Sequence, residues 1–543
     1  MPRRRRSVFS GPSYGRSAMW LEPGMRRRRG WRRLPGRAAA LVALVVAAGA
    51  VGYVVIGDRP GDARRPVAER FAAAWARGDR AAMWRLVDAG TRRAYPLRRF
   101  GATYRAADAA ATVTGVQVGR AAEPRDGRVA VPVTVRTRTF GTLRGTVALP
   151  MAQAGDSARV RWRPYLRLPG LRPGESVRRR ILRRPRRAAV LAPDGRRLDR
   201  VPAAAAVANG LERRFAARLG GRPGAELRFG DRVVRRVRVR RGRSVHATLR
   251  PGLQTAALAA LGNRVGGVAV LRPRDGSVLA LAGLAVSAPQ PPGSTFKIIT
   301  LAAALQARIA RPSSTYPVRT SATLSGVRLR NANDEACGGT LVTAFAVSCN
   351  SVFAPLGARL GARRLVSMAQ AFGFNEAPRV PSAKRSRISA PSRLKDSLAV
   401  GAAAIGQDRD LATPLEMAGV AATIGNRGVR AKPRVARADP VSRRRVVRAS
   451  VARQVRDMMI GVVRGGTGTA ANIPGVQVAG KTGTAELRPT AGGPPDPRNT
   501  DAWFVAFAPA TNPRVAVAVM LVGAGAGGAA AAPIARRVLQ AAL

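Results

Sequence analysis

Three short motifs in the second half of the sequence contain the residue types that acyl transfer needs. In the first, Ser294 and Lys297 stand three residues apart, immediately before the apolar stretch 298–305. On a helix these two side chains share one face, so the lysine can reach the serine hydroxyl. A lysine removed from water loses its proton readily and can act as a base toward serine. The motif predicts a serine nucleophile at a helix N-terminus, although a capping serine followed by a snorkelling lysine gives the same pattern.

The second motif consists of Ser348, Cys349 and Asn350, which end the stretch 340–347. A hydroxyl and an amide that flank one residue at a helix–loop junction can both be presented to a cleft. An ordinary polar loop has the same composition, so this motif carries weight only together with the others.

The third motif is Lys481, Thr482, Gly483 and Thr484, and it follows the strand-like stretch 476–479. On a strand the two threonines face one side, and the glycine lets a ligand backbone approach closely. A cationic lysine and two hydroxyls suit a substrate carboxylate. The alternative is a strand that simply ends in a threonine-glycine turn.

Lysine usage sets two of these motifs apart. Only five of the 95 basic residues are lysine, yet Lys297 and Lys481 are two of the five. Arginine cannot replace a base that must lose its proton, because guanidinium stays charged at any working pH. Ser392 and Lys395 are also three residues apart, but they follow a proline among charged residues. They are expected to lie at the solvent-exposed start of a helix.

The elements that must position the motifs are predicted to form one large domain, residues 251–543. Residues 253–261 have a helical pattern, and 533–543 close the chain as a second helix. Strand patterns occur in two pairs, around Asp275-Gly276 and around Asn512-Pro513, and they cover 267–271 with 277–282 and 503–507 with 515–521. Strands at both ends with helices between them predict an α/β sandwich.

A smaller α+β domain is predicted over residues 62–166. Val67, Phe71 and Trp75 recur every four residues and indicate an amphipathic helix. After a second short helix at 81–87, the period changes to two in the stretches 127–135, 140–149 and 159–163. Residues 167–250, rich in arginine with Pro-Gly pairs, are expected to form an extended linker or pedestal with little core of its own.

The N-terminal segment predicts membrane attachment. Residues 1–37 hold twelve arginines and one acid, and 38–57 begin with nineteen uncharged residues, Ala38 to Ile56. At 1.5 Å per residue these span about 28 Å, close to the hydrocarbon thickness of a bilayer. The arginine excess should keep the N-terminus in the cytoplasm and the rest of the chain outside it. A cleaved signal peptide is the alternative, with small residues at Ala48 and Ala50, but the apolar run continues past that point.

Composition excludes several classes of site. One histidine (His246) and two cysteines exclude an HExxH zinc site and a four-cysteine metal site, so neither a metal nor another cofactor is expected. The net charge of +66 would suit nucleic acid, but no nucleic-acid motif or basic face with stacking aromatics accompanies it. An anionic envelope or membrane surface is the better expectation, and nucleic acid is not expected as a partner.

The order of the three motifs resembles that of the penicillin-recognising serine acyltransferases. The motif serines lie 54 residues apart, and the lysine-threonine-glycine motif follows about 130 residues later. Segments 406–407, 413–418 and 503–509 also look like that family. Residues 62–166, with Trp162 and the exit 168–171, resemble the nuclear-transport-factor-2-like domain of methicillin-resistance-type transpeptidases. The whole resembles a class B penicillin-binding protein, a multidomain fold with one transmembrane helix, a small α+β domain, an extended pedestal and a β-lactamase-like α/β serine transpeptidase domain.

The resemblance implies a role for each motif residue. Ser294 would attack a D-alanyl carbonyl of a peptidoglycan stem peptide, and Lys297 would take its proton. Ser348 would relay a proton to the leaving amine, with Lys481 keeping that network charged. The remaining expected substrate contacts are Asn350 to an amide, Thr482 and Thr484 to the terminal carboxylate, and backbone N–H groups of Ser294 and Thr484 as the oxyanion hole. β-Lactams would acylate the same serine, and a membrane glycan polymerase is a further implied partner.

Rival functions of the same fold stay open at this point. A class A β-lactamase needs a glutamate-held water, typically in a Glu-x-x-Leu-Asn segment, and none lies between Asn350 and Lys481. A D,D-carboxypeptidase has the same motifs, because they do not encode the choice of acceptor. A non-catalytic β-lactam sensor or scaffold is the non-enzyme alternative, and the intact motifs argue against it.

The two cysteines are predicted to pair. Cys337 and Cys349 are twelve residues apart beside the second motif, and no other cysteine competes with them. The predicted extracytoplasmic compartment is oxidising. We therefore expect an intramolecular disulfide beside the active site.

Overall fold

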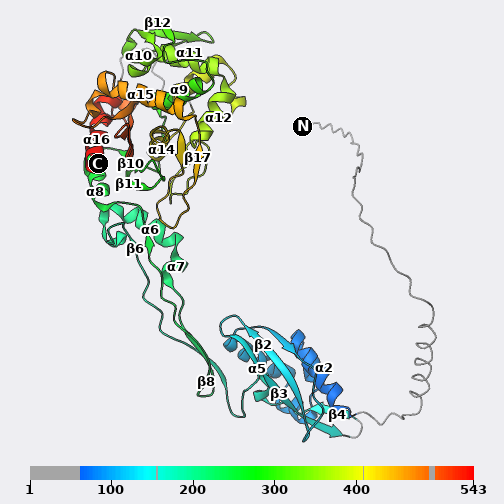
Figure 1. Ribbon diagram of the computed structural model, residues 1–543. Helices are drawn as coiled ribbons and strands as arrows, with labels where there is room; N and C mark the ends of the chain where they lie inside the picture. The colour runs from blue at the N-terminus through cyan, green and yellow to red at the C-terminus, as the bar shows by residue number, and fades with distance from the viewer. Residues whose placement is uncertain (1–61, 155–156, 408, 488–495) are drawn as a thin grey trace, which may run out of the picture. The chain divides into compact units, whose positions relative to one another are not determined.

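The computed structural model describes residues 62–154, 157–407, 409–487 and 496–543 (Figure 1). The predicted leader (1–37) and membrane anchor (38–57) lie outside these residues. Within the described ranges, no helix combines the length and the apolar character that crossing a bilayer requires.

The N-terminal part consists of helices followed by a sheet. The helices are α2 (Arg64–Arg77), α3 (Arg80–Arg85), α4 (Ala89–Ala94) and α5 (Leu97–Ala111). The sheet has the order β1 (Val113–Val118), β2 (Arg128–Thr137), β3 (Gly141–Ala154), β4 (Ser157–Val160), and the short helix η1 (Pro164–Arg167) follows. The predicted helix with Val67, Phe71 and Trp75 on one face is confirmed, since all three side chains are buried in α2.

Residues 171–250 contain two small sheets and a few short helices. One sheet has the order β5 (Val177–Ile181), β7 (Ala225–Phe229), β8 (Arg232–Val237), and the other pairs β6 (Val190–Leu191) with β9 (Val245–His246). Between them lie η2 (Leu198–Arg200), η3 (Pro202–Ala204), α6 (Ala205–Arg214) and α7 (Ala216–Gly220). Val190, Leu198 and Leu211 are buried in the same hydrophobic core as side chains of the C-terminal domain. These three apolar residues therefore pack into the larger domain.

A five-stranded antiparallel sheet organises the C-terminal domain. Its order is β11 (Val278–Gly283), β10 (Gly266–Leu271), β20 (Val515–Leu521), β19 (Thr500–Ala508), β18 (Ala479–Glu486). The predicted hairpin between β10 and β11 forms because Gly276 adopts φ +69° and the Asp275 carboxylate accepts the backbone N–H of Ser277 at 3.0 Å. The two strand pairs and the α/β class are confirmed.

The period-two pattern of the central strands separates two cores. In β19, Trp503, Val505 and Phe507 belong to one core, whereas Phe504 and its alternate neighbours belong to the other. Helices α8 (Pro251–Leu261) and α16 (Gly527–Ala542) contribute to the second core. The larger core lies on the other face of the sheet and includes side chains from helices of the segment between β11 and β18.

The segment between β11 and β18 carries those helices and several short hairpin strands. Its helices are η4 (Gly293–Phe296), α9 (Lys297–Gln306), η5 (Ala332–Asp334), α10 (Leu341–Ala346), α11 (Asn350–Leu360), α12 (Ala362–Phe372), η6 (Pro391–Arg393), α13 (Ser397–Ala404), α14 (Pro414–Gly425), α15 (Ala449–Gly465) and η7 (Thr469–Ala471). Strand β12 (Thr315–Arg319) pairs with β15 (Cys337–Thr340), β13 (Ser321–Leu324) with β14 (Val327–Arg330), and β16 (Val429–Ala431) with β17 (Arg443–Arg445). A last short helix, η8 (Pro497–Asn499), precedes β19.

The C-terminal helix corrects one boundary. A helix beginning at Pro533 was expected, but α16 begins at Gly527 and contains Pro533. Its first residue lies so close to the sheet that a Cβ on Gly527 would stand 2.2 Å from the carbonyl oxygens of Gly483 and Trp503. Packing of small residues on the sheet therefore starts the helix well before the proline.

Candidate active site

The serine of the first motif lies beside the third motif. Ser294 is half-buried in η4, and Lys297 follows as the first residue of α9. Gly293 adopts φ +51°, and a Cβ there would stand 2.6 Å from the carbonyl oxygen of Thr484. Its backbone N–H donates to the carbonyl of Gly406 at 2.9 Å. A glycine is required immediately before the serine because the chain passes this close to strand β18.

Lys297 is fully buried and hydrogen-bonds to the second motif. Its Nζ donates to Asn350 Oδ1 at 2.7 Å and to the backbone carbonyl of Ser348 at 2.6 Å, and lies 3.4 Å from Ser348 Oγ. Burial holds the pKa of Lys297 well below that of free lysine, and the nearby charge of Lys481 lowers it further. A neutral amine is therefore accessible at this position, as a general base requires.

Lys481 hydrogen-bonds to the same serine, Ser348. It is buried on β18, and its Nζ donates to Ser348 Oγ at 2.8 Å. Burial lowers the pKa of Lys481 to about 7. Among the described residues, no carboxylate forms an ion pair with either lysine, so no opposite charge offsets the cost of burying two amines that share one hydroxyl.

Two phenylalanines increase the apolar character around these amines. The Nζ of Lys297 lies 5.7 Å from the centroid of the Phe353 ring, and that of Lys481 lies 5.5 Å from the centroid of Phe345. Both rings are fully buried. The rings partly stabilise the charged forms, while the dry surroundings keep deprotonation accessible.

Ser348 is held in an uncommon backbone conformation between α10 and α11. Its φ is +67°, in the left-handed region that a residue with a side chain seldom adopts. Its N–H donates to the carbonyl of Phe345 at 3.2 Å, and a disulfide between Cys349 and Cys337 ties the following residue to β15. The structure thus joins the two predicted cysteines immediately beside the second motif.

Two predicted substrate contacts are engaged within the protein. The Asn350 amide group donates to the carbonyl of Arg330 at 2.9 Å while its oxygen accepts from Lys297. At Gly483 a Cβ would stand 2.9 Å from the carbonyl oxygen of Pro292 and from Thr295 Cγ2. The missing side chain at Gly483 therefore makes room for the serine-bearing segment, whereas the sequence suggested room for a ligand.

The threonines of the third motif lie close to Thr467, a residue outside the three sequence motifs. Thr482 Oγ1 lies 2.5 Å from Oγ1 of Thr467, an exposed residue between α15 and η7. Thr484 is half-buried, and its hydroxyl accepts the N–H of Gly527 at 3.4 Å. Thr467 stands in the run Gly465-Gly-Thr-Gly, and this glycine-rich run before a strand is the one sequence signal that could have indicated it.

The second serine–lysine pair of the sequence, Ser392 and Lys395, which we call the decoy pair, lies at the surface. Both residues are exposed, and Ser392 belongs to the short helix η6. Neither shares a hydrogen bond with the motif residues among the described part of the chain. The structure therefore brings together Ser348, Asn350 and both motif lysines, and leaves the second serine–lysine pair in solvent.

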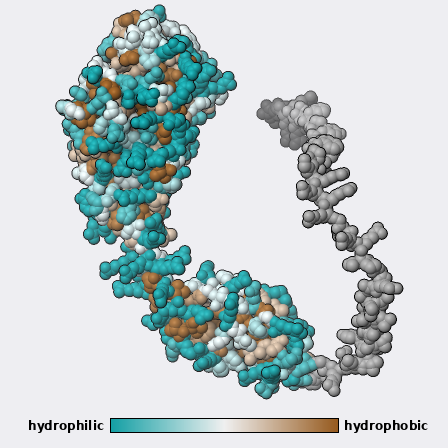
Figure 2. All heavy atoms as spheres, in the orientation of Figure 1, coloured by the Kyte–Doolittle hydropathy of each residue, from teal (hydrophilic) through white to brown (hydrophobic). Residues whose placement is uncertain are grey.

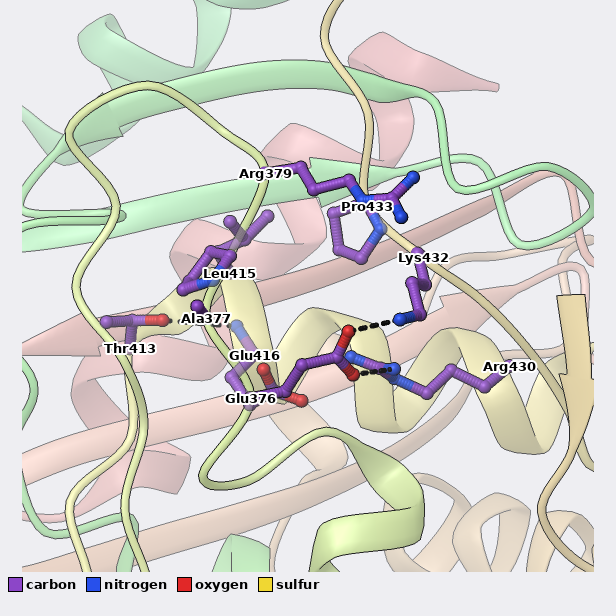
Figure 3. A pocket seen from close by; sticks show the side chains of 10 residues that line it. Glu376, Ala377, Arg379, Thr413, Leu415, Glu416, Arg430, Lys432 and Pro433 are labelled. Carbon is purple, nitrogen blue, oxygen red and sulfur yellow. Dashed lines mark hydrogen bonds and ion pairs between the residues drawn. The ribbon is translucent and has the colours of Figure 1, made fainter. Parts of the chain in front are cut away.

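A separate pocket lies at the N-terminus of α14 and holds none of the predicted site residues (Figure 3). In it, Glu376 accepts from Arg430 at 2.7 Å and also pairs with Lys432. Glu416 points toward the same ion pair, and burial raises its pKa to about 7 against the opposing charge of Arg430. This cluster is a second place where burial moves an ionisable group toward neutrality.

Comparisons with known proteins agree with this geometry. Residues 266–540 match the family model "Penicillin binding protein transpeptidase domain". The chain is 37% identical over 402 residues to the peptidoglycan D,D-transpeptidase PbpA of Mycolicibacterium smegmatis, covering 62% of this chain and 79% of the relative. It is 39% identical over 296 residues to the protein of that name in Mycobacterium tuberculosis, covering 50% of this chain and 58% of the relative.

Solved structures show the same similarity. The ceftriaxone acyl-enzyme complex of penicillin-binding protein A from M. tuberculosis matches with a TM-score of 0.51 and 34% identity, covering 56% of this chain and 81% of that one. The D,D-transpeptidase domain of a peptidoglycan glycosyltransferase from Eggerthella lenta matches with a TM-score of 0.57 and 29% identity, covering 66% and 99%. The chain therefore belongs to the class B penicillin-binding protein transpeptidase family.

Proposed function

We propose that this protein is a peptidoglycan D,D-transpeptidase that works through an acyl-enzyme at Ser294. The observation that carries the proposal is the convergence of Lys297 and Lys481 on the hydroxyl of Ser348, with Ser294 one helical turn before Lys297. The relatives named as peptidoglycan D,D-transpeptidases, and the β-lactam acyl-enzyme of a related structure, support it.

Acylation begins with transfer of the Ser294 proton to the neutral amine of Lys297. The serine oxygen attacks the carbonyl of the penultimate D-alanine of a stem peptide, and backbone N–H groups of Ser294 and Thr484 stabilise the oxyanion. The C–N bond then breaks. Ser348, bonded to both lysines, passes a proton to the departing D-alanine amine and regains one from an ammonium group.

Deacylation is the reverse sequence with a different amine. An amino group from a neighbouring stem peptide attacks the ester, gives a proton back through the same serine–lysine network, and releases Ser294. The cross-link is a new amide. A β-lactam forms the same ester but leaves slowly, because its ring-opened product stays tethered in the site.

Carboxylate recognition falls to the hydroxyls at the edge of β18. Thr484 is accessible there, and Thr467 is exposed beside the nearly buried Thr482. Lys481 adds a positive charge when it is protonated. Together they suit the terminal carboxylate of a stem peptide or the carboxylate of a penicillin.

The experiment compares cross-linking with hydrolysis. Full-length protein is given a donor pentapeptide with and without an amine acceptor, and amide product and free acid are quantified. Amide formation that competes with hydrolysis supports a transpeptidase. Free acid alone identifies a D,D-carboxypeptidase, rapid turnover of penicillin identifies a β-lactamase, and failure to acylate identifies a sensor or scaffold.

The remaining architecture extends this proposal. Four helices followed by a four-stranded sheet, with Phe100, Tyr104 and Trp162 buried together and a 3.0 Å hydrogen bond from Trp162 Nε1 to Tyr104 Oη, support the nuclear-transport-factor-2-like assignment of residues 62–166. The uncharged run 38–57 supports a single membrane anchor with the catalytic domain outside the cytoplasm. A membrane glycan polymerase is the proposed partner, because a cross-linking enzyme acts on newly made glycan.

Topology has its own test. Protease added to intact spheroplasts should digest the catalytic domain and leave a small N-terminal fragment. A mature chain that begins near Val51 would instead identify a cleaved signal peptide.

A further inference from the structure

Arginine is concentrated far above the chain average in the sheet β5-β7-β8 and its flanking segments. Residues 175–187 and 222–243, which we call the arginine ribbon, hold sixteen arginines and three acidic residues in 35 positions. The whole chain has 95 basic residues in 543. A composition bias that acts on the whole chain therefore does not explain the ribbon.

The acidic residues of the ribbon neutralise few of these charges. Glu226 is buried and pairs with Arg228 and Arg236, and Glu175 pairs with Arg232. Arg187 pairs with Glu212 outside the ribbon. Twelve exposed arginines have no ion pair among the described residues: Arg178, Arg179, Arg180, Arg183, Arg184, Arg186, Arg222, Arg235, Arg238, Arg240, Arg241 and Arg243.

The strand register distributes these cations over both faces of the sheet. Arg180, Glu226 and Arg236 stand in one row across the three strands, and Arg179, Leu227 and Arg235 form the next row. Because successive residues of a strand point to opposite faces, the two rows present guanidinium groups in opposite directions. Hydrophilic residues cover much of this segment, with apolar patches between them (Figure 2).

This distribution distinguishes between two anionic partners. A lipid bilayer is flat and can neutralise the arginines of only one face. A flexible linear polyanion can pass along an edge and contact both faces. Guanidinium groups also bind phosphate oxygens in pairs of parallel hydrogen bonds, which favours arginine at such a surface.

We propose that the arginine ribbon binds a linear polyanion whose charge comes from phosphate groups along its backbone, such as an anionic polymer of the cell envelope. Binding there would hold the catalytic domain near polymer-bearing wall without using the active site. The inference does not depend on the reaction that Ser294 performs.

The test uses the full-length chain in neutral detergent, with fluorescent linear inorganic polyphosphate as the probe. The ribbon variant carries Arg178→Gln, Arg180→Gln, Arg235→Gln and Arg238→Gln. The matched control carries the same change at four exposed arginines without ion pairs on α12 and α15, namely Arg363, Arg364, Arg453 and Arg464. Both variants have the same net charge and keep the arginine-rich leader, so their difference reports the ribbon.

The ribbon variant should bind polyphosphate at least tenfold more weakly at physiological salt, and the control should change less than twofold. The slope of log affinity against log salt should fall by about 0.7 for each phosphate group that the variant no longer binds. Both variants should acylate with a fluorescent penicillin at the parental rate, which checks folding. A second set, Arg183→Gln, Arg184→Gln, Arg186→Gln and Arg240→Gln, replaces the first if that set does not fold.

Three outcomes would overturn the proposal. An equal loss of affinity in the control would show that overall charge alone attracts the polymer. Tighter, ribbon-dependent binding to phosphatidylglycerol vesicles than to polyphosphate would identify a membrane surface as the partner. Absence of saturable binding by the parent protein would exclude the site altogether.

Discussion

The candidate active site and the arginine ribbon are both cationic, yet they use different residues in opposite environments. The candidate active site holds two fully buried lysines on one serine hydroxyl, whereas the ribbon exposes twelve arginines without ion pairs in the described chain. Burial lowers the pKa of a lysine toward neutrality, but arginine keeps its charge. Under the proposed mechanism, the two motif lysines stand where a proton must move, whereas the ribbon arginines supply charge alone.

The candidate active site depends on the surrounding fold to hold its residues in place. Two amines on one hydroxyl and a left-handed Ser348 are unfavourable by themselves, and they persist because the surrounding structure fixes them. A disulfide and the buried Phe345 and Phe353 lie around this point. The ribbon has few comparable constraints, because exposed arginines in water cost little to keep charged.

The largest expected effect comes from replacing a buried lysine of the candidate active site with arginine, the residue type that dominates the ribbon. Lys297→Arg keeps a cation beside Asn350 but cannot accept the Ser294 proton. Acylation by a fluorescent penicillin should fall by about 10²- to 10⁴-fold, the usual contribution of a general base. Stopped-flow fluorescence measures the rate.

Lys395→Arg is the matched control, since Lys395 is exposed and belongs to the decoy pair. It should acylate at the parental rate. If Lys297→Arg acylates normally while Lys395→Arg does not, Ser294 has been wrongly assigned as the nucleophile.

The second-largest expected effect concerns the disulfide between Cys337 and Cys349, beside Ser348. Replacing Cys337 and Cys349 with serine removes a bond that closes a twelve-residue separation, and should lower the free energy of unfolding by about 3 kcal/mol. Denaturant titration measures it. Reductant should lower the parent to the same level and leave the double variant unchanged.

Thiol labelling gives an independent check on the same bond. Unreduced, unfolded parent protein should react with almost no maleimide. Two labelled thiols per chain would show that the cysteines are free.

Part of this picture follows from the sequence, and the rest depends on tertiary contacts. The hairpin at Asp275-Gly276 and the apolar run 503–507 are local patterns, so the two strand pairs could be predicted. The motif lysines could be selected because their residue type is rare in this chain. The role of Gly483 could not, because Pro292 and Thr295 approach it from a distant part of the sequence. The start of α16 depends equally on the carbonyls that Gly527 contacts.

The third effect concerns the pocket of Figure 3, where the group whose pKa is shifted is an acid, the half-buried Glu416. Burial raises the pKa of Glu416 from 4.5 to about 7. Between these values the unfolded chain has released the proton and the folded chain still binds it, so this contribution to stability declines as pH rises from 4.5 to 7. Glu416→Gln should therefore match the parent near pH 4.5 and exceed its unfolding free energy at pH 8 by about 1–2 kcal/mol, a value reduced for partial solvent access.

Glu376→Gln is the matched control in the same pocket. Burial raises the pKa of Glu376, but Lys432 and Arg430 lower it by more, so its pKa is below 4.5 overall. Its carboxylate stabilises the fold above that pH, and removing it should destabilise the protein at pH 8. Thermal unfolding at both pH values measures both variants, and equal signs for the two would contradict the assignment.

The smallest expected effect tests whether the Thr467 hydroxyl binds the substrate carboxylate or only supports strand β18. Thr467→Val removes the hydroxyl that lies 2.5 Å from Thr482 Oγ1 and preserves side-chain volume. Loss of one neutral hydrogen bond costs about 0.5–1.5 kcal/mol, so the second-order acylation constant should fall by roughly 2- to 12-fold. Thr467→Ser should restore the acylation constant, and Thr469→Val, at an exposed neighbour on η7, should have no effect.

A penicillin whose carboxylate is converted to an amide gives a second test. It should acylate parent and Thr467→Val equally slowly, because the hydroxyls then have no carboxylate to bind. If Thr467→Val slows the amide as much as the free acid, Thr467 supports the strand and has no part in carboxylate recognition.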